Sequence, residues 1–305
     1  MKRILIALCA LLLSVMAVGG LTAMAAPIDP ERPASVTVCY RYDGQVFSDV
    51  ECRIFRVAEV FPDGTYALTG PFADYPVNIY GIGSQAEWRN IASTLVAYIA
   101  ADGIKPDHSV TTNAEGEAVF RNVRPGLYLI SSVQAELPDK LVTFETFLTA
   151  LPYPSEQGEH NYDVTLYPKA RTHTPTPKEI GYKVVKQWKD AGNLPHRPDT
   201  VTVDILKDGV LQSTQILSPD NNWCYRWSAP DDGSKWQAVE RNVPSEYTVT
   251  VVEEGSTILI TNVYQSQQDP PETGETTVLW PFLLVMSMAG GLLMILAIRH
   301  MRKEQ

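Results

Sequence analysis

Apolar runs at both ends of the 305-residue sequence limit where a folded region can lie. The run from Val278 to Ile298 has the length and composition of a transmembrane helix, and the basic residues in 299–305 resist translocation, which predicts a cytoplasmic tail. Residues 1–25 have the basic start, apolar stretch and small-residue end of a signal peptide cleaved after Ala25, with an uncleaved N-terminal anchor as the alternative. We therefore expect the intervening chain to be extracellular, its precursor held in the membrane by the C-terminal helix.

The composition and motifs argue against several classes of function. A formal net charge of −10 leaves no clustered Lys and Arg for phosphate binding, so no nucleic-acid partner is expected. The five histidines lack metal-ligand spacing, and we find neither a phosphate-binding glycine loop nor a Ser or Cys nucleophile motif. We expect no metal, no cofactor and no catalytic site for an external substrate, with an anchored extracellular enzyme as the alternative.

Three cysteines follow the predicted signal peptide, in a compartment where disulfides persist. Cys39 and Cys52 lie on consecutive predicted strands, Ser35–Tyr42 and Val50–Val57. If Val38 faces inward, alternation turns Cys39 outward, whereas Cys52 faces inward. A disulfide between Cys39 and Cys52 is therefore left open.

Residues 34–170 predict a first domain of short strands interrupted by one helix. Ser84 and Glu87 have the spacing of a capping box, and apolar residues follow at helical spacing, which predicts an amphipathic helix over 84–102 packed on a sheet. Further strands are expected at Glu117–Phe120, Leu127–Ser132, Thr143–Ala150 and Tyr162–Tyr167. Alternating Thr and Pro within 171–179 predict a short stiff linker.

Residues 180–265 predict a second, all-β domain. Seven short apolar segments are separated by turn signals, a pattern typical of a small sandwich. The expected strands are Tyr182–Trp188, Thr200–Lys207, Leu211–Leu217, Trp223–Ser228, Trp236–Glu240, Tyr247–Val252 and Thr257–Val263. The fold class is thus mainly β, with two tandem sandwiches and one inserted helix.

Three of these strands each place one polar residue on an otherwise apolar face: Lys186, Glu240 and Asn262. Burial disfavours charge, so it would make the Lys186 amine a nucleophile and keep Glu240 protonated, able to relay protons. The pattern favours an intramolecular isopeptide bond between Lys186 and Asn262. A buried ion pair with a hydrogen-bonded Asn, or an exposed edge lysine, is the alternative.

The second domain contains four motifs in a specific order: Lys186-Gln187-Trp188-Lys189-Asp190, Arg197-Pro198-Asp199-Thr200-Val201-Thr202-Val203, Asn222-Trp223 and Ile260-Thr261-Asn262-Val263-Tyr264. With these motifs it resembles the Cna B-type domain of Gram-positive surface proteins. The resemblance implies an Ig-like or prealbumin-like sandwich with an isopeptide triad at Lys186, Glu240 and Asn262. Trp236 and Ala238 stand where the family's Glu-bearing strand has Tyr and Val.

From Ser35-Val36-Thr37-Val38 to Leu127-Tyr128-Leu129-Ile130, the first domain resembles the N-terminal domain of sortase-assembled pilins. Tyr40 and Ser132 stand where an isopeptide Lys and Glu would be, so no internal bond is expected there. Its last strand, ending in Tyr167-Pro168-Lys169, resembles a pilin motif whose lysine accepts the next subunit, which implies Lys169 as acceptor. An ordinary solvated lysine is the alternative.

The segment 266–274 reads as a polar spacer and a sorting motif. Pro270, Pro271, Glu272, Thr273 and Gly274 resemble the LPXTG signal, with Pro270 in place of Leu, which implies sortase cleavage between Thr273 and Gly274.

Together these resemblances imply a structural subunit of a sortase-polymerised pilus on the cell wall. Its partners would be sortase, other copies or other pilins, and peptidoglycan, with a host surface ligand left open. A basal or minor pilin and a monomeric wall-anchored adhesin are alternatives.

Overall fold

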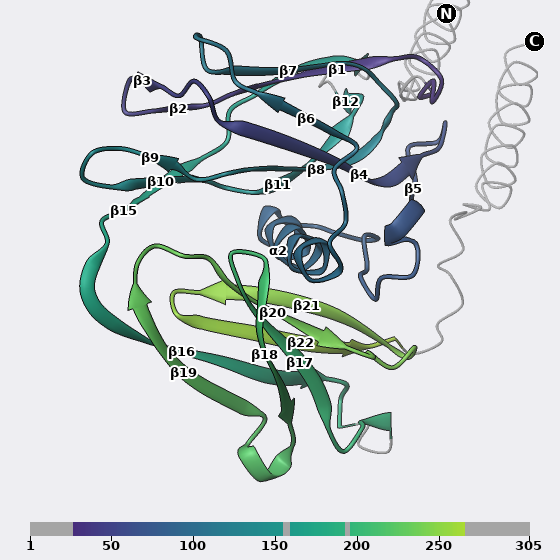
Figure 1. Ribbon diagram of the computed structural model, residues 1–305. Helices are drawn as coiled ribbons and strands as arrows, with labels where there is room; N and C mark the ends of the chain where they lie inside the picture. Colours follow the sequence, from purple (N-terminus) through teal and green to yellow (C-terminus); the bar gives the residue numbers. More distant parts are fainter. Residues whose placement is uncertain (1–26, 155–158, 193–195, 266–305) are drawn as a thin grey trace, which may run out of the picture. The chain divides into compact units, whose positions relative to one another are not determined.

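The computed structural model describes residues 27–154, 159–192 and 196–265 (Figure 1). The predicted signal peptide, sorting motif (Pro270, Pro271, Glu272, Thr273 and Gly274), transmembrane helix and basic tail lie outside these residues. Within the described ranges, no helix combines the length and apolar character needed to cross a bilayer. The prediction of a mainly β chain is confirmed, because all but one of the longer described elements are strands.

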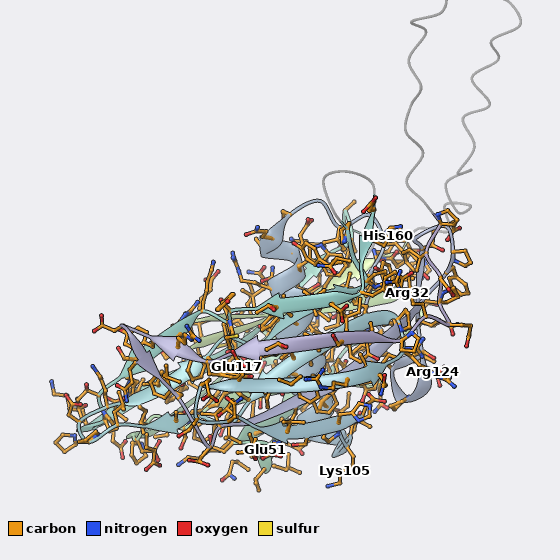
Figure 2. The ribbon with its side chains drawn as sticks, turned by 90° about the horizontal axis from the view of Figure 1, so that it is seen from above. Arg32, Glu51, Lys105, Glu117, Arg124 and His160 are labelled. Carbon is orange, nitrogen blue, oxygen red and sulfur yellow. The ribbon has the colours of Figure 1, made fainter. Side chains whose placement is uncertain are left out.

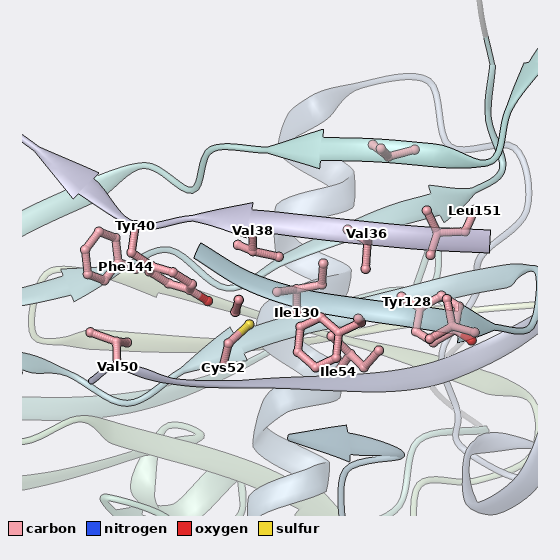
Figure 3. Packing of buried hydrophobic residues seen from close by; sticks show 14 of the residues in the cluster. Val36, Val38, Tyr40, Val50, Cys52, Ile54, Tyr128, Ile130, Phe144 and Leu151 are labelled. Carbon is pink, nitrogen blue, oxygen red and sulfur yellow. The ribbon is translucent and has the colours of Figure 1, made fainter. Parts of the chain in front are cut away.

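The first domain is built around two facing sheets (Figure 1). One has the order β14-β1-β7 and the other β11-β8-β4-β5, with β6 also paired to β4. Their strands are β1 (Ala34–Cys39), β4 (Glu51–Val60), β5 (Tyr66–Leu68), β6 (His108–Thr111), β7 (Glu117–Val123), β8 (Gly126–Ser132), β11 (Phe147–Leu151) and β14 (Asp163–Leu166). Alternate residues of β1, Val36 and Val38, and then Tyr40 point into the core between the sheets, as the sequence predicts (Figure 3). Charged side chains such as Lys105 and Arg124 lie on the outside (Figure 2).

The predicted strand Thr143–Ala150 is wrong in one respect: the chain forms two strands there. β10 (Leu141–Phe144) pairs with β9 (Ala135–Glu136) and β15 (Ala170–His173), whereas β11 pairs with β8. The chain changes sheets at Glu145, whose amide donates to the Lys169 carbonyl. Apolar alternation continues through the break, so the pattern could not show the change of partner. Small hairpins complete the domain: β2 (Arg41–Tyr42) with β3 (Gln45–Val46), and β12 (Tyr153–Pro154) with β13 (His160–Asn161).

Helix α2 (Gln85–Asp102) confirms the predicted helix and its packing on a sheet. The Ser84 side chain accepts a hydrogen bond from the Glu87 amide, and Gly103 ends the helix in the left-handed conformation that glycine adopts without strain. One face, with Ile91, Leu95 and Ile99, packs on β4 and β8. A short 3₁₀ helix, η1 (Gly70–Phe72), lies nearby in the sequence and contributes Phe72 to the same core.

The second domain is the predicted seven-stranded sandwich. One sheet has the order β19-β16-β22-β21 and the other β18-β17-β20. The strands are β16 (Thr176–Lys189), β17 (Val201–Lys207), β18 (Val210–Leu217), β19 (Cys224–Asp231), β20 (Trp236–Arg241), β21 (Tyr247–Glu254) and β22 (Thr257–Tyr264), with the 3₁₀ helix η3 (Pro219–Asn221) before β19. The prediction of a linker over 171–179 is wrong in part, because β15 continues to His173 and β16 begins at Thr176, so two residues separate the strands. β16 and β22 run parallel as direct neighbours, so the first and last strands of the domain lie side by side.

The other face of α2 contacts this second sandwich. Ala97 and Tyr98 belong to the same apolar core as Val249 and Val251 of β21. The Val251 amide donates to Thr94 Oγ1 at 2.8 Å. The sequence predicts one packing face for the helix, whereas the structure shows two.

The disulfide left open between Cys39 and Cys52 is not formed, because both thiols are free and buried. Cys39 pairs across the sheet with Glu117, on the face of β1 opposite Val38, whereas Cys52 lies in the core facing the Tyr40 hydroxyl (Figure 3). Strand alternation thus keeps the sulfurs on different sides of the first sheet.

Candidate isopeptide site

Three strands of the second domain bring the predicted triad together. Lys186 lies on β16 and Asn262 on the adjacent parallel strand β22, where Lys186 is opposite Ile260 and Asn262 is opposite Trp188. Glu240 comes from β20 in the facing sheet. The two sheets therefore supply the amine and the amide from one side and the carboxyl group from the other.

The triad is removed from solvent. The side chains of Lys186 and Glu240 are both 0% exposed, and Asn262 is 0% exposed as a residue. Lys186 Nζ lies 3.7 Å from Glu240 Oε2 and donates to the Gln187 carbonyl at 2.7 Å. Asn262 Nδ2 donates to Glu240 Oε1 at 2.8 Å. Glu240 thus contacts both groups that an isopeptide bond would join.

Two oxygens of the triad have no hydrogen-bond donor among the described residues: Glu240 Oε2 and Asn262 Oδ1. A buried acceptor without a hydrogen-bond donor is unfavourable. A proton on Glu240 would turn its carboxyl group into a donor. Rotating the Asn262 amide about its terminal torsion would exchange Oδ1 and Nδ2, so that a protonated Glu240 could donate to the amide carbonyl. The site can therefore polarise the carbonyl of Asn262.

Burial shifts both ionisable groups toward their neutral forms. Desolvation lowers the pKa of Lys186 to about 8, although the Glu240 charge opposes the shift. Desolvation likewise raises the pKa of Glu240, against the opposing effect of Lys186. A neutral amine beside a protonated carboxyl group is the pair of states that nucleophilic attack on an amide needs.

Aromatic and charged side chains close one end of the site. Lys186 Nζ lies 3.7 Å from the centre of the Trp188 ring, and Arg197 lies over the same ring at 5.5 Å. Arg197 makes two hydrogen bonds to Asp190, at 2.5 and 2.6 Å, and Tyr247 donates to the same carboxylate at 3.3 Å. The sequence motif contained Asp190 and Arg197 without a role; the structure assigns them to the wall around Trp188.

One contact to the triad comes from the first domain. The Tyr98 hydroxyl, on α2, donates to the main-chain carbonyl of Glu240 at 3.0 Å. Tyr98 was not predicted from the sequence. The available signal was the width of the apolar stripe, which Ala97 and Tyr98 extend beyond Leu95 and Ile99.

Lys169 lies apart from the triad, in the three residues between β14 and β15, and is exposed. Its carbonyl accepts from the Glu145 amide, so the main chain is fixed there. Its amine makes no hydrogen bond or ion pair with the described residues. In the first domain, Ser132 is opposite Cys52 in the β4–β8 pairing, with Tyr40 across the core.

No group of three or more His, Cys, Asp and Glu in the described ranges is arranged to hold a metal ion. The triad is the one cluster of buried, pKa-shifted groups that the sequence analysis singled out, and the described residues bring all three of its members together.

Residues 182–263 match the family described as the Cna protein B-type domain, so the chain contains such a domain and all three triad residues lie in it. A collagen adhesin of Staphylococcus aureus is 31% identical over 91 residues, which are 29% of this chain and 8% of the adhesin. The type 1 fimbrial subunit of Actinomyces viscosus is 32% identical over 88 residues, 27% of this chain and 16% of the subunit. The chain thus matches only a small part of each relative, and neither is named as an enzyme.

Solved structures similar to this chain include the full-length major pilin SpaD of Corynebacterium diphtheriae, at 17% identity and a TM-score of 0.31, covering 77% of this chain and 65% of the pilin. The fimbrial protein FimP of Actinomyces oris is 19% identical with a TM-score of 0.28, covering 76% of this chain and 51% of that protein.

Proposed function

We propose that this chain is a structural subunit of a covalently polymerised pilus on the cell surface, strengthened by an internal Lys186–Asn262 isopeptide bond. The observation that carries the proposal is the solvent-free contact of Lys186 and Asn262 with one carboxyl group, Glu240. The similarity of the second domain to parts of a fimbrial subunit and an adhesin supports a pilin-like or adhesin-like surface role.

The proposed bond forms once per molecule and needs no cofactor. Neutral Lys186 Nζ attacks Asn262 Cγ, while protonated Glu240 donates a hydrogen bond to Oδ1 and stabilises the oxyanion. Glu240 then relays a proton from the attacking amine to the departing Nδ2, and the Cγ–Nδ2 bond breaks. The products are a secondary amide and one ammonia, and the carboxyl group is regenerated.

Polymerisation would use the exposed amine of Lys169. In the proposed assembly a sortase cleaves between Thr273 and Gly274 and transfers the acyl group of Thr273 to Lys169 of another copy, with the last subunit passed to peptidoglycan. Because the joined surfaces differ, such a contact continues without closing and gives a fibre. The position of Lys169 outside a regular strand, on main chain fixed by Glu145, leaves the amine accessible to an enzyme.

The similarity to a collagen adhesin favours a second candidate, a monomeric wall-anchored adhesin. A basal or minor pilin would share its features but use Lys169 once or not at all. These candidates differ from a shaft subunit in the number of copies joined.

Detergent-boiled wall extracts separate the candidates. For a shaft subunit, the unaltered chain gives a ladder of high-mass bands that Lys169→Ala abolishes, whereas the control Lys178→Ala, which removes another exposed amine nearby, leaves the ladder intact. A single band in every case overturns the shaft assignment and supports the adhesin.

Intact mass tests the internal bond independently. The unaltered chain should be lighter than its sequence mass by one ammonia, about 17 Da, and Lys186→Ala and Asn262→Ala should restore the full mass. Lys183→Ala, on the same strand but outside the triad, is the matched control and should keep the loss. The full sequence mass in the unaltered chain overturns the bond.

A further inference from the structure

Both sheets of the second sandwich end in an edge strand on the side where α2 packs. β20 ends one sheet and β21 the other, and edge strands carry unpaired main-chain groups. The Val249 amide donates to the Pro76 carbonyl at 2.6 Å and the Val251 amide to Thr94 Oγ1 at 2.8 Å. The first domain therefore supplies the acceptors that the β21 edge lacks.

β20, which carries Glu240, is held in the same way. Among the described strands it pairs with β17 alone, so carbonyls on its other side need a partner. The Tyr98 hydroxyl satisfies the Glu240 carbonyl at 3.0 Å, and Tyr98 is 5% exposed. The bond is thus shielded from water and acts on the main chain of the triad residue itself.

The residue after Glu240 gives a second anchor. Arg241 donates to Asp102 at 2.5 Å and to the Ala101 carbonyl at 3.4 Å, both at the C-terminal end of α2, where carbonyls favour a cation. It also bonds Asp204 of β17 at 2.7 Å. The end of β20 is therefore fixed on one side by its own sheet and on the other by the helix.

We propose that Tyr98 is a positioning residue for isopeptide formation, so that the first domain completes the reaction site of the second. The hydroxyl fixes β20 at Glu240, and the ring excludes water from that side. A carboxyl group that moves by a fraction of an ångström loses its alignment with the amine and the amide. This inference rests on the proposed Lys186–Asn262 bond.

The test follows bond formation over time. The full chain is made by cell-free synthesis, stopped in acid at intervals, and the fraction lighter by about 17 Da is measured by intact mass. Tyr98→Phe keeps the ring and removes only the hydroxyl, and it should slow the reaction about fivefold, the factor for one hydrogen bond of ordinary net strength. Tyr75→Phe is the matched control, since that neighbouring hydroxyl donates to Asp102 and not to Glu240.

Thr94→Val separates positioning from general docking. It leaves the buried Val251 amide without its acceptor, so it should weaken the contact between helix and sandwich at least as much as Tyr98→Phe does. Positioning predicts the larger rate defect for Tyr98→Phe; a merely structural role predicts the larger defect for Thr94→Val. The positioning role also predicts that the alkaline limit of the rate moves to lower pH in Tyr98→Phe, because without the hydroxyl β20 is held less firmly, water reaches Glu240, and its raised pKa falls.

The outcomes distinguish failure of the positioning role from failure of the isopeptide bond. An unchanged rate in Tyr98→Phe, or an equal slowing in Tyr75→Phe or Thr94→Val, overturns the positioning role and leaves the isopeptide bond standing. Absence of any mass loss in the unaltered chain overturns the bond itself and this inference with it.

Discussion

At the scale of single residues, the triad depends on one physical effect acting on two groups with opposite signs. Removing water lowers the pKa of the Lys186 amine and raises the pKa of the Glu240 carboxyl group, so both move toward neutrality. Their mutual attraction opposes each shift, because an ion pair would stabilise both charges. Two protonation states therefore compete. In the reactive state the shared proton is on Glu240 and Lys186 is neutral; in the ion pair the same proton is on Lys186 and Glu240 is charged.

This competition predicts a bell-shaped pH dependence of isopeptide formation. At low pH a second proton keeps Lys186 charged and unreactive; at high pH Glu240 ionises and can no longer donate to Asn262. Glu240→Gln keeps a hydrogen-bond donor but cannot relay a proton, so the rate should fall about a hundredfold or more and lose its alkaline limb. The mass time course, repeated across pH, measures both effects. A Gln variant as fast as the unaltered chain would remove Glu240 from the mechanism.

At the scale of secondary structure elements, the start of α2 allows a local test of the helix that joins the two domains. The Glu87 amide donates to Ser84 Oγ at 3.2 Å, and Glu87 Oε2 accepts in return from the Ser84 hydroxyl and the Gly83 amide. Ser84→Ala should destabilise the chain by about 1 kcal/mol, whereas Ser84→Thr, which keeps the hydroxyl as both donor and acceptor, should change little. Urea unfolding measures both variants. Equal stability of the Ala and Thr variants would show that this cap contributes nothing.

The same elements show how far the sequence could predict the fold. Six of the seven strands of the second domain were predicted to within about three residues because alternation between core and solvent is a signal contained in the strand itself. The exception is β16, which begins at Thr176, six residues before the predicted start at Tyr182. The segment Thr143–Ala150 was predicted as one strand because alternation reports which face is buried and not which neighbour is paired. The second packing face of α2 was not predicted because Ala97 and Tyr98 are buried by β20 and β21, which lie far away in the sequence.

In the candidate site, too, some features could be predicted from the sequence and others could not. The alternation of side chains along three strands was enough to predict that Lys186, Glu240 and Asn262 face the same core, since alternate side chains of a strand point to the same side. The contacts around them follow from tertiary packing: Arg197 meets Asp190 across a loop, and Tyr98 arrives from a different domain. No spacing in the sequence encodes these distances.

At the scale of the whole molecule, the proposed bonds define a path for tension. In a fibre joined through Lys169 and Thr273, force enters after most of the first domain, passes along β16 and leaves through β22. Because β16 and β22 are parallel neighbours, a Lys186–Asn262 bond transfers the load directly from one to the other. The strands between them, β17 to β21, and the first-domain strands before Lys169 would then carry little of it.

The same cross-link should govern thermal stability. It closes a loop of about 76 residues, for which the loss of entropy in the unfolded chain is worth about 4 kcal/mol. Lys186→Met removes the amine while filling much of its volume, and we expect it to lower the melting temperature by about 10 °C. Lys183→Met, on the same strand and outside the triad, is the control and should leave the temperature nearly unchanged. Calorimetry of both variants measures the effect, and intact mass checks that the bond is lost in Lys186→Met. If this variant nevertheless melts at the same temperature as the unaltered chain, the cross-link does not stabilise the domain at equilibrium. Its role is then to resist force alone.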